Sequence, residues 1–400
     1  MTQADIVIIG GGMVGATLAC ALAERHWRVA LVEARPPQPF DPDSPWDLRV
    51  SAISRASQRI FEHLQLWPAM QAMRVSPYDR MVVWEEGAGE IRFDAADMAE
   101  PDLGHIIENR VIQRAAWQRL EQLDDVLLHC PARIATLETA DEAVRVGLEG
   151  GETIEARLVV GADGARSRLR ELAGIGVSRQ DYGQKGIVCL VEVERGHEYT
   201  AWQRFLPSGP LALLPLADTR QCSIVWSADT PLADELMALD DAAFAERLQA
   251  AFGTRLGALR PLGRRAAFPL AGSQAQHYVQ HRLALVGDAA HTIHPLAGQG
   301  VNLGLLDAAD LVDRLRPGHD PGGRAALRAY ERTRRSEDVL MMRAMEGFRY
   351  LFGNELAPLR LLRGAGLSLA DRLPPLKQAF MRQALGLRRD LPALARVGCA

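Results

Sequence analysis

The stretch GDAAHTIHPLAGQGVNLG at residues 287–304 combines an acid, two histidines and several glycines, and it directly follows the apolar run LALV. An acid at the end of a strand, such as Asp288, can accept hydrogen bonds from the hydroxyls of a polyol. The N–H groups at the start of the helix that follows favour negative charge. We therefore predict that a strand ends here to present a ligand to a helix. Gly298 and Gly300 open this helix, which starts near Val301 and Asn302.

A second glycine-rich turn, GGGMVG at residues 10–15, lies between an expected strand at 5–9 and an expected helix that reaches about residue 25. Glycines at these positions let backbone N–H groups approach a pyrophosphate at the positive end of the helix. Glu33 ends the next strand, at 28–33, where a carboxylate can accept from a ribose hydroxyl. The order predicts dinucleotide binding, and the alternative is a tight strand–helix turn. The loop residues concerned are Gly10, Gly12, Met13, Val14 and Gly15.

A third segment, GADGARS at residues 161–167, again follows an apolar strand. Asp163 within it is typical of a turn in which an aspartate caps the backbone. On its own the segment predicts only such a turn.

The histidines at 291 and 294 invite a metal or acid–base interpretation. They lie three residues apart in a loop, without a nearby pair of carboxylates, so they lack the geometry of a metal site and we expect no metal. We interpret His291 as a structural residue that caps the turn after the strand.

The elements around these segments predict an α/β fold with two parts. The strand–glycine turn–helix–strand order indicates a βαβ unit and a parallel sheet. From about 186 to 227 the chain changes to short alternating strands, which predict an antiparallel sheet inserted into the first part. We expect a discontinuous Rossmann-like domain at 1–75, 101–176 and 277–340, a sheet domain at 76–100 and 177–276, and a C-terminal helical region at 341–400.

The composition indicates a globular chain without a nucleic-acid partner. The chain has 400 residues, is 48% hydrophobic and carries a formal net charge of −4. Its five cysteines are scattered and form no CxxC, which fits a reducing compartment. The uncharged run at 6–23 is interrupted by glycines and is not preceded by basic residues, so we do not interpret it as a signal or a membrane span. We expect a cytoplasmic protein.

The three segments together resemble the flavoprotein aromatic hydroxylases of the p-hydroxybenzoate hydroxylase type. Within that group the chain is similar to the ubiquinone-biosynthesis hydroxylases, through LRVSAIS (48–54), LGHIIENRVIQ (103–113) and the segment at 287–304. The tail segments YERTRRS (330–336) and GFRYLFG (347–353) resemble the 2-polyprenylphenol hydroxylase branch, also called VisC or UbiI. The resemblance covers nearly the whole chain.

The resemblance implies that the cofactor is FAD. Asp288 would bind the ribityl chain, Pro295 would lie beside the flavin ring with His294 near the substrate, and the 298–302 backbone would face the N1–C2=O end of the flavin.

By the same resemblance, Arg49 and Gln113 match positions that contact FAD, Gln113 less closely because many members carry arginine there. Asp163 would connect the pyrophosphate region with the substrate domain.

The implied reaction is hydroxylation of a polyprenylated phenol by O2 through a flavin C4a-hydroperoxide, on a 2-polyprenylphenol-type intermediate of ubiquinone biosynthesis. A later intermediate, a different ring carbon, or a reductase or oxidase reaction on a prenyl lipid are alternatives, as is a flavin-binding structural subunit. No second GxGxxG follows a strand, so the reductant is expected to be NAD(P)H without a separate domain, or an electron-transfer partner. A homo-oligomer is left open.

The C-terminal stretch 340–390 carries nine basic and four acidic side chains. Its leucine-rich, arginine-spaced pattern is typical of an interfacial or partner-binding helix. We expect that this stretch either makes peripheral contact with a membrane or a biosynthetic complex, or forms a helical cap on the flavin domain.

Overall fold

The structure, a computed structural model, describes residues 2–85, 89–293 and 300–352, and the C-terminal residues 378, 381–382, 385–387 and 390–397. The C-terminal stretch predicted to contact a membrane or a complex lies largely outside the described residues. Within the described part of the chain, no helix is both long and apolar enough to cross a membrane.

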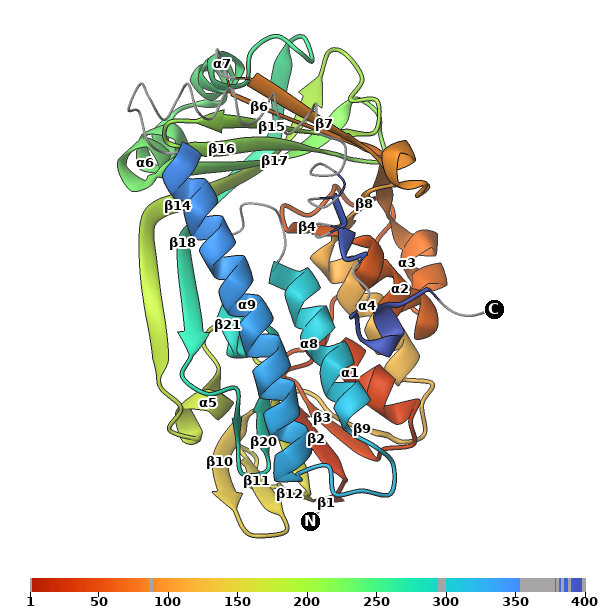
Figure 1. Ribbon diagram of the computed structural model, residues 1–400. Helices are drawn as coiled ribbons and strands as arrows, with labels where there is room; N and C mark the ends of the chain where they lie inside the picture. Colours follow the sequence, from red (N-terminus) through yellow and green to blue (C-terminus); the bar gives the residue numbers. More distant parts are fainter. Residues whose placement is uncertain are drawn as a thin grey trace.

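A six-stranded sheet lies at the end of the molecule that holds the N-terminus (Figure 1). Its inner strands are short, apolar and buried on both faces, as parallel strands covered by helices must be. All neighbouring strands are parallel except the β19–β20 pair. In spatial order the strands are β19 (Val279–Gln280), β20 (Leu283–Leu285), β13 (Leu158–Gly161), β2 (Ile6–Ile9), β3 (Val29–Val32) and β9 (Val126–His129).

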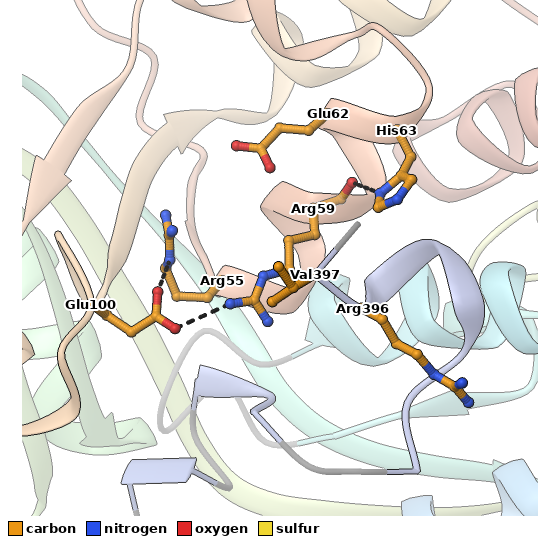
Figure 2. A pocket seen from close by; sticks show the side chains of 7 residues that line it. All are labelled: Arg55, Arg59, Glu62, His63, Glu100, Arg396 and Val397. Atoms are coloured by element: carbon orange, nitrogen blue, oxygen red, sulfur yellow. Dashed lines mark hydrogen bonds and ion pairs between the residues drawn. The ribbon is translucent and has the colours of Figure 1, made fainter. Parts of the chain in front are cut away.

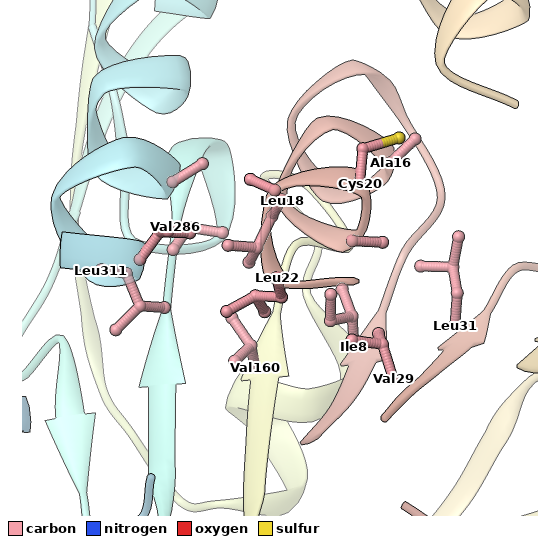
Figure 3. Close-up of a cluster of buried hydrophobic side chains, with 14 of the residues drawn as sticks. Ile8, Ala16, Leu18, Cys20, Leu22, Val29, Leu31, Val160, Val286 and Leu311 are labelled. Carbon is pink, nitrogen blue, oxygen red and sulfur yellow. The ribbon is translucent and has the colours of Figure 1, made fainter. Parts of the chain in front are cut away.

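Helix α1 (Met13–Ala23) packs against this sheet and is buried from Gly15 to Ala23. It is apolar on all sides because other helices cover the face that the sheet leaves open. Figure 3 shows Leu18 and Leu22 of α1 next to Ile8, Val160 and Val286 of the sheet. The neighbouring helices are α4 (Asn109–Leu120), α8 (Gly300–Arg314) and α9 (Arg324–Phe352), the last of which runs beside α8 along much of the molecule in Figure 1.

An eight-stranded sheet forms the other end of the molecule, and all its neighbours are antiparallel except β6 and β15. Alternate side chains point to opposite faces, so its two faces are distinct. One face is covered by α6 (Thr230–Ala238) and α7 (Asp241–Phe252). In spatial order the strands are β21 (His291–Thr292), β18 (Leu259–Ala275), β14 (Val177–Val193), β17 (Gln221–Asp229), β16 (Gly209–Pro215), β15 (Thr200–Leu206), β6 (Arg80–Glu85) and β7 (Gly89–Asp94).

Two smaller sheets and several short helices complete the described fold. The four-stranded sheet consists of β1 (Thr2–Gln3), β12 (Thr153–Ala156), β11 (Val144–Leu148) and β10 (Ile134–Thr139). The three-stranded sheet consists of β4 (Val50–Ile53), β8 (Gly104–Glu108) and β5 (Ser76–Tyr78). The remaining elements are α2 (Arg55–His63), α3 (Trp67–Met73), α5 (Arg168–Leu172), and the 3-10 turns η1 (Ala95–Met98), η2 (Gly287–Ala289) and η3 (Ala393–Ala395).

The α/β class and the two-part layout predicted from the sequence are confirmed, with local differences. The sequence at 152–160 is typical of one strand, but the chain is divided near Arg157 between β12 and β13, which belong to different sheets. Strand β14 begins at Val177, well before the expected start at 186. The segment Phe268-Pro269-Leu270 lies inside the 17-residue β18. We keep the predicted domain ranges as a proposal, although β5 pairs with β8 and not with the large sheet.

The start of α1 is held against the sheet by direct contact between backbones. Gly10 adopts a positive φ of 106°, and a Cβ on Gly15 would lie 1.9 Å from the Gly10 carbonyl oxygen and 2.9 Å from Cβ of Ala162. Neither contact leaves room for a methyl group. The first glycine loop and the GADG segment can therefore meet only if these positions are glycine.

We expect Gly15→Ala to lower the free energy of unfolding by about 1–3 kcal/mol or more, because the added methyl group overlaps backbone atoms that cannot move independently. Chemical denaturation of the full chain without added ligand measures this. Gly150→Ala is the matched control, since a Cβ there meets nothing within 4 Å. Equal stability of the two variants would contradict the steric argument.

Candidate functional site

The glycine loop before α1 is fixed at Gly11 by three hydrogen bonds. Its N–H donates to Oε2 of Glu33 (2.6 Å), and its carbonyl accepts from Nε2 of Gln113 (2.9 Å) and Nε1 of Trp117 (2.8 Å). Sequence reasoning identified Glu33 and Gln113 but missed Trp117. The signal available was the spacing, since residues four apart in RVIQRAAW share one helix face.

The N-terminus of α1 is open to a ligand. Gly12 is the N-cap, no side chain caps the helix there, and its first turn contains no acidic residue. A Cβ on Gly12 would meet nothing within 4 Å. The first N–H groups of a helix have no partner within the helix and carry partial positive charge. This end of α1, with Met13 and Val14 in its first turn, can therefore receive an anion.

Glu33 follows β3, as predicted, and its carboxylate is half-buried beside the loop. Besides the bond from Gly11, Oε1 accepts from the N–H of Arg35 (3.0 Å). A carboxylate has about four acceptor positions, so Glu33 can still accept from a sugar hydroxyl.

Asp288 and Arg49 are distant in sequence but close in the structure. Asp288 lies in η2, directly after β20 and Val286, and its side chain is exposed. Protein atoms nevertheless lie close enough to the carboxyl to remove part of its hydration, and this desolvation raises its pKa. The positive charges of His291 and Arg49 act to lower the pKa. The Arg49 side chain is exposed too and has no hydrogen-bond or ion-pair partner within the described part of the chain. An accessible acid close to an accessible cation suits a polar ligand with hydroxyls and phosphates.

The first turn of α8 is anchored by the side chain of Asn302. Its Oδ1 accepts from the Ser54 N–H (3.0 Å) and the Ser57 hydroxyl (2.7 Å), and its Nδ2 donates to the Ala52 carbonyl (2.8 Å). Asn302 therefore fixes the helix start through its side chain, and the backbone N–H groups near Gly300 and Val301 are available to a ligand. Gly304 on the next turn lies against Val14 of α1, so the two helix N-termini are neighbours.

Asp163 accepts hydrogen bonds at the start of the short helix α5, whose N-cap residue is Ser167. Its Oδ2 accepts from the N–H groups of Arg168 (2.7 Å) and Leu169 (3.1 Å). Burial raises the pKa of this carboxyl, and those backbone bonds oppose the shift. α5 leads into β14 of the large sheet. Asp163 therefore binds backbone five and six residues later, at the start of the helix, and not within its own turn. Its connection of the pyrophosphate region with the substrate domain stays a prediction.

His291 does have a pair of carboxylates beside it, so the reason given for excluding a metal was wrong. Its Nε2 lies 2.6 Å from Oδ2 of Asp307 and 3.3 Å from Oδ2 of Asp338. Nε of Arg334 donates to Oδ1 of Asp307 (2.7 Å). His291 thus forms a buried ion pair and does not merely cap a turn. The sequence did contain a signal for this cluster. Arg334 and Asp338 lie at helical spacing from the buried Leu327 and Tyr330, so these charged residues share the buried face of the helix.

Three predicted site residues, His294, Pro295 and Gly298, lie outside the described residues. Their roles stay predictions. The described residues on either side are Ile293, which follows β21, and Gly300, the first residue of α8.

A separate hollow of about 540 Å³ opens beside α2 and involves none of the predicted residues (Figure 2). Its charges pair with one another: Nε of Arg55 and Nη2 of Arg59 each lie 3.1 Å from Glu100. It lacks an apolar wall for an aromatic ring, so we do not assign the flavin to it. Its lining residues are Arg55, Arg59, Glu62, His63, Glu100, Arg396 and Val397.

The described residues fit FAD. The α1 N-terminus suits its pyrophosphate, Glu33 suits the ribose, Asp288 suits the ribityl chain, and the start of α8 suits the electron-rich end of the flavin. The cradle at Gly12 and the accessible Asp288 are the observations that support this fit.

Comparison with known proteins gives one family and consistent relatives. The FAD binding domain family model matches residues 3–344. The 3-demethoxyubiquinol 3-hydroxylase of Escherichia coli strain K12 is 43% identical over 387 residues, covering 96% of this chain and 98% of that protein. The ubiquinone hydroxylase UbiL of Rhodospirillum rubrum is 42% identical, with 96% and 90% covered. The human mitochondrial ubiquinone biosynthesis monooxygenase COQ6 is 34% identical, with 95% and 92% covered.

Solved structures show the same fold at lower identity. The p-nitrophenol 4-monooxygenase PnpA of Pseudomonas putida DLL-E4 superposes with a TM-score of 0.78 at 19% identity, covering 97% of this chain and all of that one (100%). PqsL of Pseudomonas aeruginosa, a probable FAD-dependent monooxygenase, superposes with a TM-score of 0.73 at 22% identity, with 92% and 99% covered.

We expect Gly12→Ala to weaken FAD binding by about tenfold or more, equivalent to about 1.4 kcal/mol, while the protein stays as stable as the native chain. The reason is that the added methyl group enters the open space at the α1 N-terminus and meets no protein atom. Titration of the apoprotein by FAD fluorescence quenching, alongside thermal unfolding, checks both parts. Native affinity for FAD would show that the pyrophosphate lies elsewhere.

Proposed function

This chain belongs to the FAD binding domain family and, within it, to the ubiquinone-biosynthesis hydroxylases, and from this premise we propose that it hydroxylates a late ring intermediate of the 3-demethoxyubiquinol type. The protein is an FAD-dependent monooxygenase. The match with the Escherichia coli 3-demethoxyubiquinol 3-hydroxylase over almost the full length of both chains is the observation that carries the substrate proposal.

The preference for 2-polyprenylphenol, taken from the tail segments, finds no support in the names of these relatives. Its stated alternative, a later intermediate, does. Both substrates are electron-rich phenols with a polyprenyl tail, so they place the same physical demands on the flavin loops. The choice between them rests on the wall of the substrate site.

The face of the eight-stranded sheet opposite α6 and α7 offers an apolar wall for such a substrate. It packs against the region of β4 and β8, next to the flavin loops. Several of its side chains are only half-buried, so apolar surface stays available to a bound molecule. The residues of this wall are Val188, Leu190, Leu214, Leu216, Val225, Leu262 and Ala266, facing Leu48, Ile106, Trp46, Val50, Ala52 and Tyr78.

The proposed positions of FAD and of the phenol determine what the cofactor does and what the protein does. Bound FAD supplies the reaction of its reduced form with O2. Residues of this chain hold it: the α1 N-terminus binds the pyrophosphate, and Asp288 orients the ribityl chain. Backbone N–H groups near Gly300 stabilise negative charge on the flavin. The apolar wall orients the phenol ring and excludes water. The reductant is NAD(P)H or an electron-transfer partner.

A single-turnover reaction tests the activity. The full chain is loaded with FAD, reduced chemically, mixed with 3-demethoxyubiquinol or 2-polyprenylphenol under oxygen-18 gas, and its products are weighed by mass spectrometry. We expect one labelled oxygen in the ring of 3-demethoxyubiquinol and little in 2-polyprenylphenol. Labelling of 2-polyprenylphenol alone would overturn the substrate, and a changed prenyl tail without label would indicate a reductase.

We expect Val225→Glu to lower kcat/KM for the polyprenylated phenol by about tenfold or more while the affinity for FAD stays native, because a charge is costly in an apolar wall. Steady-state kinetics and FAD titration separate the two effects. Leu128→Glu, at an exposed apolar position on β9, is the control and should behave as native. Loss of FAD affinity in the Val225 variant would place this residue outside the substrate wall.

A further inference from the structure

Four fully buried charged side chains meet directly behind the segment that carries Asp288. His291, Asp307, Arg334 and Asp338 are each at most 1% exposed. His291 bridges the two carboxylates, and Arg334 bonds Asp307 and lies 3.6 Å from Oδ1 of Asp338. We call these four residues the buried charge cluster. Neither the site nor the mechanism above uses it.

Burial raises the pKa of Asp338 to about 6, so both carboxylates are ionised above that pH. In that range the buried charge cluster is neutral only if His291 is protonated. Two carboxylates then balance one guanidinium and one imidazolium. Burial alone would lower the pKa of His291, but Asp338 and Asp307 outweigh it and raise that pKa to about 9. His291 and Arg334 correspondingly hold the pKa of Asp307 below its usual range, against the effect of burial. A neutral imidazole would leave one negative charge buried without compensation, which is costly.

The buried charge cluster joins three elements that form the proposed flavin site. Oδ2 of Asp307 accepts from the Gly287 N–H (2.9 Å) as well as binding His291, so one carboxylate holds both ends of η2. Asp307 itself lies on α8, two turns after the helix start that faces the flavin. His291 also pairs with Gln274 of β18, the long strand that reaches the substrate wall.

We propose that His291 is a positioning residue for FAD: its imidazolium, held between Asp307 and Asp338, fixes η2 so that Asp288 faces the ribityl chain. This inference rests on the proposed placement of FAD at Asp288. The other titratable groups packed around His291 are Tyr278, whose ring stacks on it at 5.8 Å, Tyr330, Glu337 beside Arg334, and Asp288 with Arg49 on the flavin side.

The same residues offer a histidine and two carboxylates within 4.8 Å, as a metal site would. Arg334 argues against a metal, because its guanidinium already neutralises Asp307 and would repel a divalent cation. The charges of the four buried residues balance one another, and Glu337, which also pairs with Arg334, is partly exposed to solvent. We therefore assign the cluster to positioning.

The sign of the pH dependence follows from the direction of the shift. The pKa of His291 is raised above its ordinary 6.5, so its stabilising contribution is complete below that value and is lost as pH rises through about 9. FAD binding should weaken over the same range in the native chain. A variant without the histidine should lack this dependence.

The test is FAD titration of the full-length apoprotein between about pH 7 and about pH 10. Native protein is compared with His291→Gln, Asp338→Asn, the double variant of both, Asp288→Ala, and the exposed His281→Gln as matched control. We expect His291→Gln to raise the Kd about tenfold or more at neutral pH, because a buried negative charge is left over. The double variant should return to within about threefold of native with no step near pH 9, because charge balance is restored.

Additive losses in the double variant would overturn the proposal, since they would mean that His291 acts only by packing and hydrogen bonding. A native Kd in His291→Gln, or a marked stabilisation of the native chain by Zn²⁺, would overturn it as well. Failure of the native chain to bind FAD, or a native Kd for Asp288→Ala, would instead contradict the placement of the cofactor. The two failures are thus distinguishable.

Discussion

The fold depends on a steric constraint at the start of α1. The backbone at Gly15 lies against the carbonyl of Gly10, and Gly10 in turn lies against Ala162. These contacts fix α1 at the ends of β2 and β13 with no freedom to slide. Once α1 is placed, Gly11 can be bound from Glu33, Gln113 and Trp117, and the open N-terminus of the helix has one defined direction. That backbone contact therefore sets the direction in which the N-terminus of α1 faces a ligand.

Arginines connect the segments that glycine brings together. Arg170 on α5 donates to the carbonyl of Ala289 (2.7 Å) and to that of Ala165 (2.8 Å), joining the GADG segment to η2. Arg282 forms a bidentate pair with Asp320 at 2.9 Å, closing the connection after α8. A planar guanidinium with five donors can satisfy several acceptors at once, which a lysine cannot do. Arg334 has the same function behind η2.

The sequence was sufficient for features that depend on local pattern. The apolar run at 5–9, the glycines after it and the helix beyond them specify a βαβ unit by themselves, and the position of Glu33 follows from strand length. What failed depends on pairing between distant residues. The alternation of 152–160 continues across Arg157, and only the neighbouring strands decide that the chain changes sheets there. Likewise, nothing local to His291 reveals that Asp307 and Asp338 will meet it, because those carboxylates come from two later helices.

The strand order of the parallel sheet has a consequence for how the protein is made. Neighbouring strands come from residues as far apart as 6–9, 158–161 and 283–285, and the helix that completes the buried charge cluster follows only at 324–352. Contacts of such high sequence separation form slowly, and a growing chain on the ribosome cannot make them until late. The antiparallel sheet between them is largely complete in sequence by residue 275. During translation, the antiparallel sheet can therefore fold before the parallel-sheet part has received its last helix, α9. We expect FAD to bind only after synthesis of this helix.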